Sequence, residues 1–430
     1  MRKLKTSLLL SMLVFLIVVS AACSSSDDTS SNNDGSGKQD KVVLDYWHTY
    51  GEQEEKVLVE EIKPAFEEEH PHIELKLTRQ PHEGLKQQVI AGVAGNAAPD
   101  LMRMDIVWTS EFAQLNALAE VSSFDGFEEV ENQLFDAPMS TNFYDGGYYG
   151  LPINTNTKVA IYNKEVLEKA GLSEPPTTME ELEDAARKAV GAGAAGGISI
   201  VGVGQTWDYL PYFWSLGGRL TDDEFTQFEG HLNSVESLQA LETIVRWNEE
   251  GLISPTMLGG QPGTWEGIDR GEYLMIDDGP WFFSILMNEE GKISPLDYSV
   301  WAPIPEGVNG SRSVIGGENL VIFESSKNKE AAWKFAKWMT GEKAQKIMGV
   351  GTGLIPTNMA AAQDPEFLEL PFIEAYVEQL KTALPRTPLP QWSEVEQVIT
   401  LNIEKVLRGE MDAKEALDDA AKKSDNIINK

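Results

Sequence analysis

Strand-like and helix-like patterns alternate along this chain, and that alternation constrains its fold more than any other feature. Residues 42–47 have the character of a buried strand, and apolar residues recur at helical spacing over 54–69. Pro71 ends that helix, a second strand is predicted over 73–77, and an amphipathic helix is expected over 85–94. This order is typical of a largely parallel sheet covered by helices. The sequence therefore predicts the α/β class.

The same kinds of element continue to the end of the sequence. Further strands are predicted at 101–102, 159–162, 198–201 and 273–276, and further helices at 179–190, 235–250, 330–340, 342–348, 394–407 and 413–428. Thr178 followed by Glu181 has the spacing of a capping box, which fixes the start of one helix. The roughly 390 residues beyond position 40 exceed what one hydrophobic core usually supports. Two lobes are therefore expected.

The first forty residues have a different composition. Basic residues within 2–5, an uncharged apolar run over 8–19 and small residues before Cys23 predict a signal peptide over 1–22. Cys23 is the only cysteine in the sequence and resembles the lipobox cysteine of bacterial lipoproteins, which implies lipidation and anchoring at the outer face of the cytoplasmic membrane. Residues 24–40 lack aromatic and aliphatic side chains and predict a flexible tether. Ordinary secretion with an unmodified thiol is the alternative.

Charge limits the partners that the chain can have. The sequence holds 68 acidic and 35 basic residues, which gives a formal net charge of −33. Such a surface repels phosphate backbones, so a nucleic-acid partner is not expected. With one cysteine, no disulfide can form within the chain, and a monomer is expected.

Motifs for catalysis or cofactor binding are not supported by their context. Residues 191–196 match G-x-G-x-x-G, but a helix precedes them and a strand follows, the reverse of a dinucleotide site. His70 and His72 are the only close histidine pair, and a turn at a helix end explains them better than a metal does. Asp277 and Asp278 are adjacent, but acidic residues are too abundant for this to indicate a glycosidase. No cofactor, metal or enzymatic activity is predicted.

Aromatic residues give the best indication of a ligand. The sequence holds 11 tryptophans, and many of them fall in predicted turns rather than on periodic faces. A flat apolar ring that also carries an N–H group suits the face of a sugar ring. In α/β sheets, ligands bind at the carboxyl ends of the strands, where His48 and the segment 278–281 fall. Turn position and chemistry add these candidates: His48, Tyr50, Trp207, Tyr209, Asp278 and Glu318.

Several segments occur in the order of a known family. They are 98–101 with Trp108, 149–152 with 161–164, 211–214 with 217–218, 278–281, and 316–319 with 326–332. Together they resemble the extracellular solute-binding proteins of ABC sugar importers, the family that contains maltose-binding protein. The resemblance covers nearly the whole chain after about residue 41. It implies two α/β lobes with a ligand cleft between them, joined by crossing hinge segments.

The resemblance also implies boundaries and site residues. Lobe 1 is expected to comprise 41–153 and 316–362, and lobe 2 to comprise 154–315 and 363–430. By position, the family's cleft contacts fall on Asp105, Asn156, Trp281 and Trp392, with Trp281 in the place of a stacking tryptophan.

The predicted function is that of the receptor of an ABC importer. It would capture a neutral di- or oligosaccharide between its lobes and deliver it to a membrane permease by lobe closure. A secreted carbohydrate-active enzyme is one alternative. A binding protein for a polyol, a sugar phosphate or a peptide is another, because Arg79, Arg103 or Arg386 could attract an anionic ligand despite the acidic composition.

Overall fold

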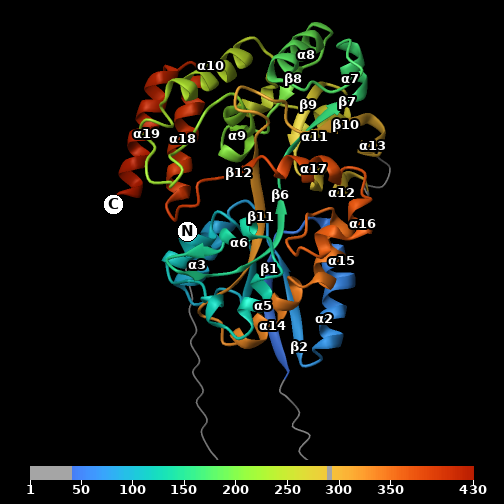
Figure 1. The fold of residues 1–430 in the computed structure, drawn as a ribbon, viewed down its shortest axis with the longest axis vertical. Helices are drawn as coiled ribbons and strands as arrows, with labels where there is room; N and C mark the ends of the chain where they lie inside the picture. The colour runs from blue at the N-terminus through green and yellow to red at the C-terminus, as the bar shows by residue number, and fades with distance from the viewer. Residues whose placement is uncertain (1–40, 288–292) are drawn as a thin grey trace, which may run out of the picture. The chain divides into compact units, whose positions relative to one another are not determined.

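The computed structural model describes residues 41–287 and 293–430, and most of its strands form two sheets (Figure 1). The predicted signal peptide (1–22), Cys23 and the tether (24–40) lie outside the described residues, so they remain predictions. Within the described ranges, no helix has the length and apolar character needed to cross a membrane.

The first sheet contains the N-terminal strands. Its order is β12-β11-β3-β1-β2, and β6 also pairs with β11. The strands are β1 Val42–His48, β2 Ile73–Arg79, β3 Leu101–Asp105, β6 Leu151–Asn156, β11 Ser313–Ile322 and β12 Ala383–Pro385. β1 is parallel to β2 and β3, as predicted, but β11 runs antiparallel to both β3 and β6. The sheet is therefore mixed. Its antiparallel strand, β11, enters from the other half of the molecule.

Amphipathic helices pack against this sheet with their apolar faces. They are α1 Glu52–Val57, α2 Lys63–Glu69, α3 Leu85–Ala94, α4 Thr109–Gln114, α14 Lys329–Met339 and α15 Glu342–Thr352. A π-helical turn over Leu58–Ile62 joins α1 to α2, so the helix predicted over 54–69 is continuous. Leu58 and Phe66 are fully buried in the core, which also contains Leu44 and Phe335.

The second sheet has the order β10-β7-β9-β8. Its strands are β7 Val159–Asn163, β8 Gly196–Ser199, β9 Tyr273–Asp278 and β10 Ser299–Ala302, and its main helices are α8 Met179–Gly191, α9 Thr206–Ser215, α10 Val235–Glu249, α18 Trp392–Leu407 and α19 Ala413–Ile428. Thr178 forms the predicted capping box with Glu181 at the start of α8. The strand predicted over 198–201 lies two residues earlier, at Gly196–Ser199.

Shorter elements complete the described chain. They are α5 Phe127–Glu131, α6 Asp136–Ser140, β4 Phe143–Tyr144, β5 Gly147–Tyr148, α7 Lys164–Lys169, α11 Thr264–Asp269, α12 Trp281–Leu286, α13 Pro295–Tyr298, α16 Pro365–Leu368 and α17 Ile373–Leu380, with 3₁₀ turns at Val121–Ser123, Pro255–Leu258 and Ala361–Gln363.

Two extended segments cross side by side from one sheet to the other (Figure 1). One runs from β6 into β7 and the other is the start of β11, and Asn156 pairs with Gly316 between them. Thr157 Oγ1 donates to the carbonyl oxygen of Val314 at 2.9 Å. Val314 belongs to the second sheet's core, whereas Leu320, later in β11, belongs to the first. The lobe boundaries given above remain a prediction.

Candidate functional site

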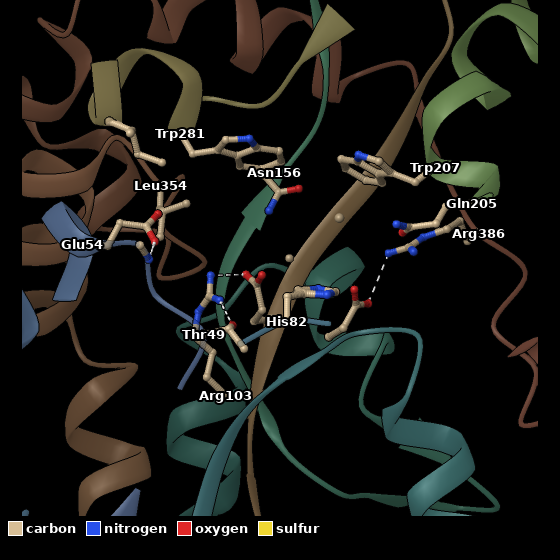
Figure 2. Close-up of a pocket in the computed structure, with 16 residues that line it drawn as sticks. Thr49, Glu54, His82, Arg103, Asn156, Gln205, Trp207, Trp281, Leu354 and Arg386 are labelled. Carbon is tan, nitrogen blue, oxygen red and sulfur yellow. Dashed lines mark hydrogen bonds and ion pairs between the residues drawn. The ribbon is translucent and has the colours of Figure 1, made fainter. Parts of the chain in front are cut away.

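A cavity of about 350 Å³ lies where the crossing strands, α1, α9 and α12 meet (Figure 2). The residues that line it are Thr49, Gly51, Glu54, His82, Arg103, Asp105, Asn156, Gln205, Trp207, Trp281, Ile285, Gly316, Gly317, Glu318, Leu354 and Arg386. Asp105 and Asn156 end their strands here, Trp281 begins α12, and Trp207 is the second residue of α9. The cavity therefore lies at strand ends, where an α/β fold places ligands.

Two indole rings form one side of the cavity. The ring centroids of Trp207 and Trp281 lie 6.3 Å apart, with 31° between the ring planes. In Figure 2 both rings lie on the side opposite Arg103 and Thr49, with Asn156 beneath them. We refer to this pair as the indole platform. The two rings are neighbours with tilted planes, so together they offer an extended apolar surface.

Two glycines make the platform possible. A Cβ atom on Gly279 would lie 2.2 Å from the ring of Trp281. A Cβ atom on Gly316 would lie 2.2 Å from Asn156 Oδ1 and 2.7 Å from the ring of Trp207. Any other residue at either position would displace an indole ring or the Asn156 amide.

Arg103 organises the opposite side of the cavity. Its guanidinium pairs with Glu318 at 2.7 Å, donates to Thr49 Oγ1 at 2.6 Å and lies 4.3 Å from the centre of the Tyr50 ring. Asn154 donates to the same Glu318 carboxylate at 2.6 Å. Burial raises the pKa of Glu318, and the charge of Arg103 opposes that shift. Burial also lowers the pKa of Arg103, but the acidic groups around it, Glu318 first among them, together outweigh this effect and the pKa is raised.

A second arginine reaches the cavity from the loop after β12. Arg386 pairs with Asp105 at 3.2 Å and lies 5.3 Å from the centre of the Trp207 ring. The Nε atoms of Arg103 and Arg386 are buried without a hydrogen-bond partner, and so is Oδ1 of Asn156. Buried polar atoms without partners are costly, so these three are candidates for hydrogen bonds to a ligand.

The charges that line the cavity nearly cancel. Arg103 and Arg386 supply two positive charges, and Glu54, Asp105 and Glu318 supply three negative ones. Each arginine is already paired with one of those carboxylates. The lining therefore has no excess positive charge with which to hold an anion.

A second cavity of about 660 Å³ meets the first at the indole platform. The residues that line it are Val201, Trp207, Thr256, Gly259, Gly260, Gln261, Gly263, Thr264, Trp265, Glu266, Asp278 and Trp281. Asp278 accepts hydrogen bonds from Trp265 Nε1 and from the backbone N–H of Gly279, the latter at 2.7 Å. Burial raises the pKa of Asp278 to about 6, although the bond from Trp265 opposes the shift.

A buried ion cluster lies next to the platform, with the Lys158 ammonium 5.7 Å from the centre of the Trp207 ring. Lys158 is 1% exposed, and its ammonium lies 2.5 Å from Asp277 and 3.9 Å from Asp208, the residue after Trp207. Burial raises the pKa of Asp208 to about 7, the charge of Lys158 opposes the shift, and Asp277 adds to it. Burial lowers the pKa of Lys158, but the three aspartates around it, Asp277 first among them, together outweigh this effect and the pKa is raised. Sequence reasoning did not identify Lys158, because a single lysine between strands carries no pattern.

The structure brings six of the ten predicted ligand contacts to a cavity. The first cavity is lined by five of them: Asp105, Asn156, Trp207, Trp281 and Glu318. The second cavity is lined by Asp278 and again by Trp207 and Trp281. Thr49, Glu54, His82, Gln205 and Leu354 also line the first cavity and were not predicted. Thr49 and Gln205 follow or precede predicted candidates, and that proximity is the one signal that could have identified them.

The structure does not place the other four predicted contacts in the lining of either cavity, because their side chains are buried. Tyr50 is 1% exposed and packs under Arg103, and His48 is fully buried next to it. Burial lowers the pKa of His48 to about 4, assisted by Arg103, so its ring is neutral at pH 7. Tyr209 and Trp392 are each 1% exposed in the core of the second sheet. In this structure the four residues support the site and do not line it.

Known proteins resemble this chain along most of its length. It is 28% identical over 379 residues to a protein of Brucella abortus (strain 2308) named as a binding protein, covering 86% of this chain and 90% of that one. It is 25% identical over 377 residues to the galactooligosaccharide-binding protein of Bacillus subtilis (strain 168), covering 83% of each. The GacH receptor of Streptomyces glaucescens, described unliganded and with acarbose, has a TM-score of 0.81 at 24% identity, covering 91% of this chain and 99% of that one.

The sequence profile of a protein family covers more than half of the chain. The profile of the bacterial extracellular solute-binding proteins matches residues 51–346, which include both crossing segments and most of the residues that line the first cavity. The solved structures share the same α/β fold. This chain belongs to the bacterial extracellular solute-binding protein family, whose members are non-enzymatic binding components of ABC importers.

Proposed function

We propose that this protein binds a neutral di- or oligosaccharide in the first cavity and delivers it to a membrane permease. The observation that carries the proposal is the indole platform facing a polar wall that has no excess positive charge. Sugar rings present apolar C–H faces and a rim of hydroxyl groups, and this cavity has a surface for each. The oligosaccharide-binding relative from Bacillus subtilis supports the same ligand class.

Each part of the cavity has a role in the proposal. The rings of Trp207 and Trp281 stack on the apolar faces of the sugar. Asp105, Asn156 and Glu318 accept hydrogen bonds from its hydroxyl groups, and the Nε atoms of the two arginines donate to its oxygens. Hydrogen bonds to charged groups are stronger than neutral ones, so this wall would determine which hydroxyl pattern binds.

A neutral ligand fits better than a charged one. A sugar phosphate or an acidic peptide would bring its charge close to Glu54, Asp105 and Glu318, and the two arginines are already paired. Repulsion between like charges within a few ångströms would then oppose binding. Polyols and uncharged peptides stay in the test as competing ligands.

The second cavity supports a ligand of more than one sugar unit. It shares the indole platform with the first cavity, so a chain could continue past Trp207 and Trp281. Gly259 and Gly263 line it, and a Cβ atom at either position would meet no atom within 4 Å. Their backbone is therefore open to close approach by a ligand.

Delivery requires that the ligand change the arrangement of the protein. A sugar that touches both the indole platform and the opposite side of the cavity, where Arg103 lies, stabilises the arrangement in which these two sides face each other. In our proposal the lobes are 41–153 with 316–362 and 154–315 with 363–430, and the permease recognises the closed form. Lipidation at Cys23 would keep the receptor beside that permease.

The carbohydrate-active enzyme is no longer an alternative. The family that the chain belongs to is non-enzymatic, which overturns that reading. The competing ligands are therefore other solutes, and the choice among them rests on binding measurements.

The test is isothermal titration calorimetry with neutral mono-, di- and oligosaccharides, a polyol, a sugar phosphate and a peptide. We expect a neutral oligosaccharide to bind and Trp281→Ala to weaken that binding about 100-fold, because truncating a central aromatic contact costs about 2–4 kcal/mol. Trp338→Ala is the matched control, since Trp338 lies on α14 and bonds to Glu69. Binding of the sugar phosphate or the peptide alone would refute the proposal.

A further inference from the structure

A polar contact outside both cavities joins the two halves of the molecule. Ser393 Oγ, at the start of α18, donates to Glu111 Oε2 on α4 at 3.1 Å. Lys86 Nζ, on α3, lies 2.5 Å from the same Glu111 oxygen and also donates to Ser393 Oγ. We call these three residues the edge contact. Ser393 is the one member that lies on the second sheet's side.

Buried neighbours hold each side of the edge contact in place. Leu85 is 1% exposed and Phe112 is fully buried, and both belong to a core against the first sheet. Trp392, next to Ser393, is 1% exposed in the core of the second sheet. The three polar groups can therefore meet only when the two cores stand in the arrangement of this structure.

We infer that the edge contact is a latch that sets how often the two halves are closed, and thereby the affinity for the ligand. The inference rests on the proposed function for the part that concerns affinity. None of its three residues lines either cavity. The contact therefore acts on the ligand through the arrangement of the two halves and not by touching it.

A second contact between the halves lies inside the first cavity. Arg386 pairs with Asp105 at 3.2 Å, but both residues also line the first cavity, where we propose that the ligand binds. A change at either one would alter contact with the ligand and closure together. The edge contact separates the two effects, which makes it the better place for a test.

Affinity follows from the fraction of protein in the competent arrangement. When that fraction falls, the apparent dissociation constant rises in inverse proportion. The bonds that cross between the halves are the two hydrogen bonds of Ser393, and their charged partners are partly buried, with side-chain exposures of 15% for Lys86 and 21% for Glu111. We expect the loss of these bonds to lower affinity about fivefold, which matches the net contribution of a typical hydrogen bond.

The test uses Ser393 variants of the full chain. Ser393→Ala removes both bonds between the halves and leaves the pair Lys86–Glu111 intact. Ser393→Tyr adds a bulky ring that prevents the same approach. Ser140→Ala is the matched control, because Ser140 bonds only locally, to the carbonyl oxygen of Ala137. Circular dichroism and the melting temperature establish that each variant is folded.

Small-angle X-ray scattering without ligand is the first readout. We expect the radius of gyration to increase in Ser393→Ala, to increase further in Ser393→Tyr, and to equal the wild-type value in Ser140→Ala. For a neutral oligosaccharide, the dissociation constant should rise about fivefold in Ser393→Ala, with faster dissociation. Folded Ser393 variants with an unchanged radius of gyration would overturn the latch. If no sugar binds to the wild type, the proposed function fails, while the scattering result still decides on the latch.

Discussion

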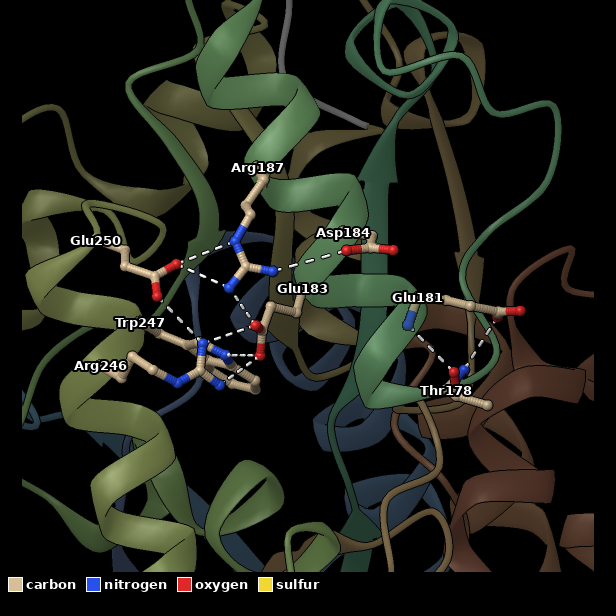
Figure 3. A network of polar contacts seen from close by, with 8 residues as sticks. All are labelled: Thr178, Glu181, Glu183, Asp184, Arg187, Arg246, Trp247 and Glu250. Atoms are coloured by element: carbon tan, nitrogen blue, oxygen red, sulfur yellow. Dashed lines mark hydrogen bonds and ion pairs between the residues drawn. The ribbon is translucent and has the colours of Figure 1, made fainter.

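Two arginine–glutamate clusters in this protein contain the same chemical groups but differ in how completely the hydrogen-bonding atoms of those groups are paired within the protein. On the outer surface of the second sheet's half, Glu183 on α8 faces Arg246 on α10 (Figure 3). One Glu183 oxygen accepts from Arg246 at 2.7 Å and from Arg187, and the other accepts from Arg246 at 2.7 Å and from Trp247 at 2.6 Å. Both oxygens are therefore saturated by the protein itself.

In the first cavity, the Arg103–Glu318 pair keeps unused capacity. Arg103 Nε is buried without a partner, although the rest of the guanidinium pairs with Glu318 and Thr49. A saturated network ties two helices together and offers nothing to a ligand. A buried network with vacant donors is costly in isolation and becomes satisfied when a ligand arrives. The unpartnered Nε atom, and not the number of ion pairs, distinguishes the cluster that we propose to bind the ligand from the Glu183 cluster.

Among changes in the two clusters, Arg103→Met should have the largest effect on stability and on binding. It leaves the Glu318 carboxylate partly buried with Asn154 as its remaining partner. We expect the free energy of unfolding to fall by about 3 kcal/mol, the lower end for breaking a buried pair. Binding of the neutral oligosaccharide should weaken at least tenfold. Urea unfolding and calorimetry measure the two effects.

The double variant Arg103→Met with Glu318→Gln separates stability from binding. Removing both charges leaves no unpaired ion, so most of the lost stability should return. Binding should remain weak, because the donors of Arg103 are still missing. Recovery of both properties would mean that the pair is structural, like the Glu183 network.

The sequence was a good guide to elements with a repeating pattern. α3 has the predicted bounds, and the predicted capping box at Thr178 is present. The prediction placed strand β8 of the second sheet two residues too late, because Gly196 and Gly197 are typical of a turn. A Cβ atom on Gly197 would lie 2.2 Å from Ala186 on α8, so this strand needs glycine where the helix packs against it.

The site was less predictable because side-chain direction is a tertiary property. Trp281 and Trp392 have the same chemistry and both begin helices, yet the first lines both cavities and the second is core. Arg386 lies in an irregular loop that gives no periodic signal. The rule that ligands bind at strand ends was a partial guide, since Asp278 ends β9 and lines the second cavity, whereas His48 ends β1 and is buried. Asp105 and Asn156 were identified by the resemblance to the family.

The buried aspartates near the indole platform and Glu183 should make stability respond to pH in opposite directions. The pKa of Asp278 is raised to about 6, so the folded state holds its proton longer than the unfolded state does. Stability should therefore fall by up to about 3 kcal/mol as pH rises from about 4 to 6. Asp208, with a pKa of about 7, adds a fall of the same sign. Asp278→Asn should flatten this part of a melting-temperature profile, and an unchanged slope would exclude Asp278 as the cause.

Glu183 should affect the stability of the folded state at lower pH than the two aspartates do. The hydrogen bonds from Arg246 lower the pKa of Glu183 to about 2, against the opposing effect of burial. Its stabilising effect is therefore complete above its ordinary pKa and is lost as pH falls toward about 2. Acid unfolding between pH 4.5 and 2 should report on this network.

Glu183→Gln should give the smallest effect and test the comparison most directly. The amide keeps one acceptor oxygen but replaces the other with a donor that faces Arg246 or Trp247, so stability should fall by about 1 kcal/mol. Affinity for the oligosaccharide should stay within about twofold, because no residue of this network lines either cavity. Calorimetry on the variant at pH 7 measures this directly. A loss of affinity comparable to that of Arg103→Met would mean that saturation of hydrogen bonds does not distinguish a structural ion network from a binding one.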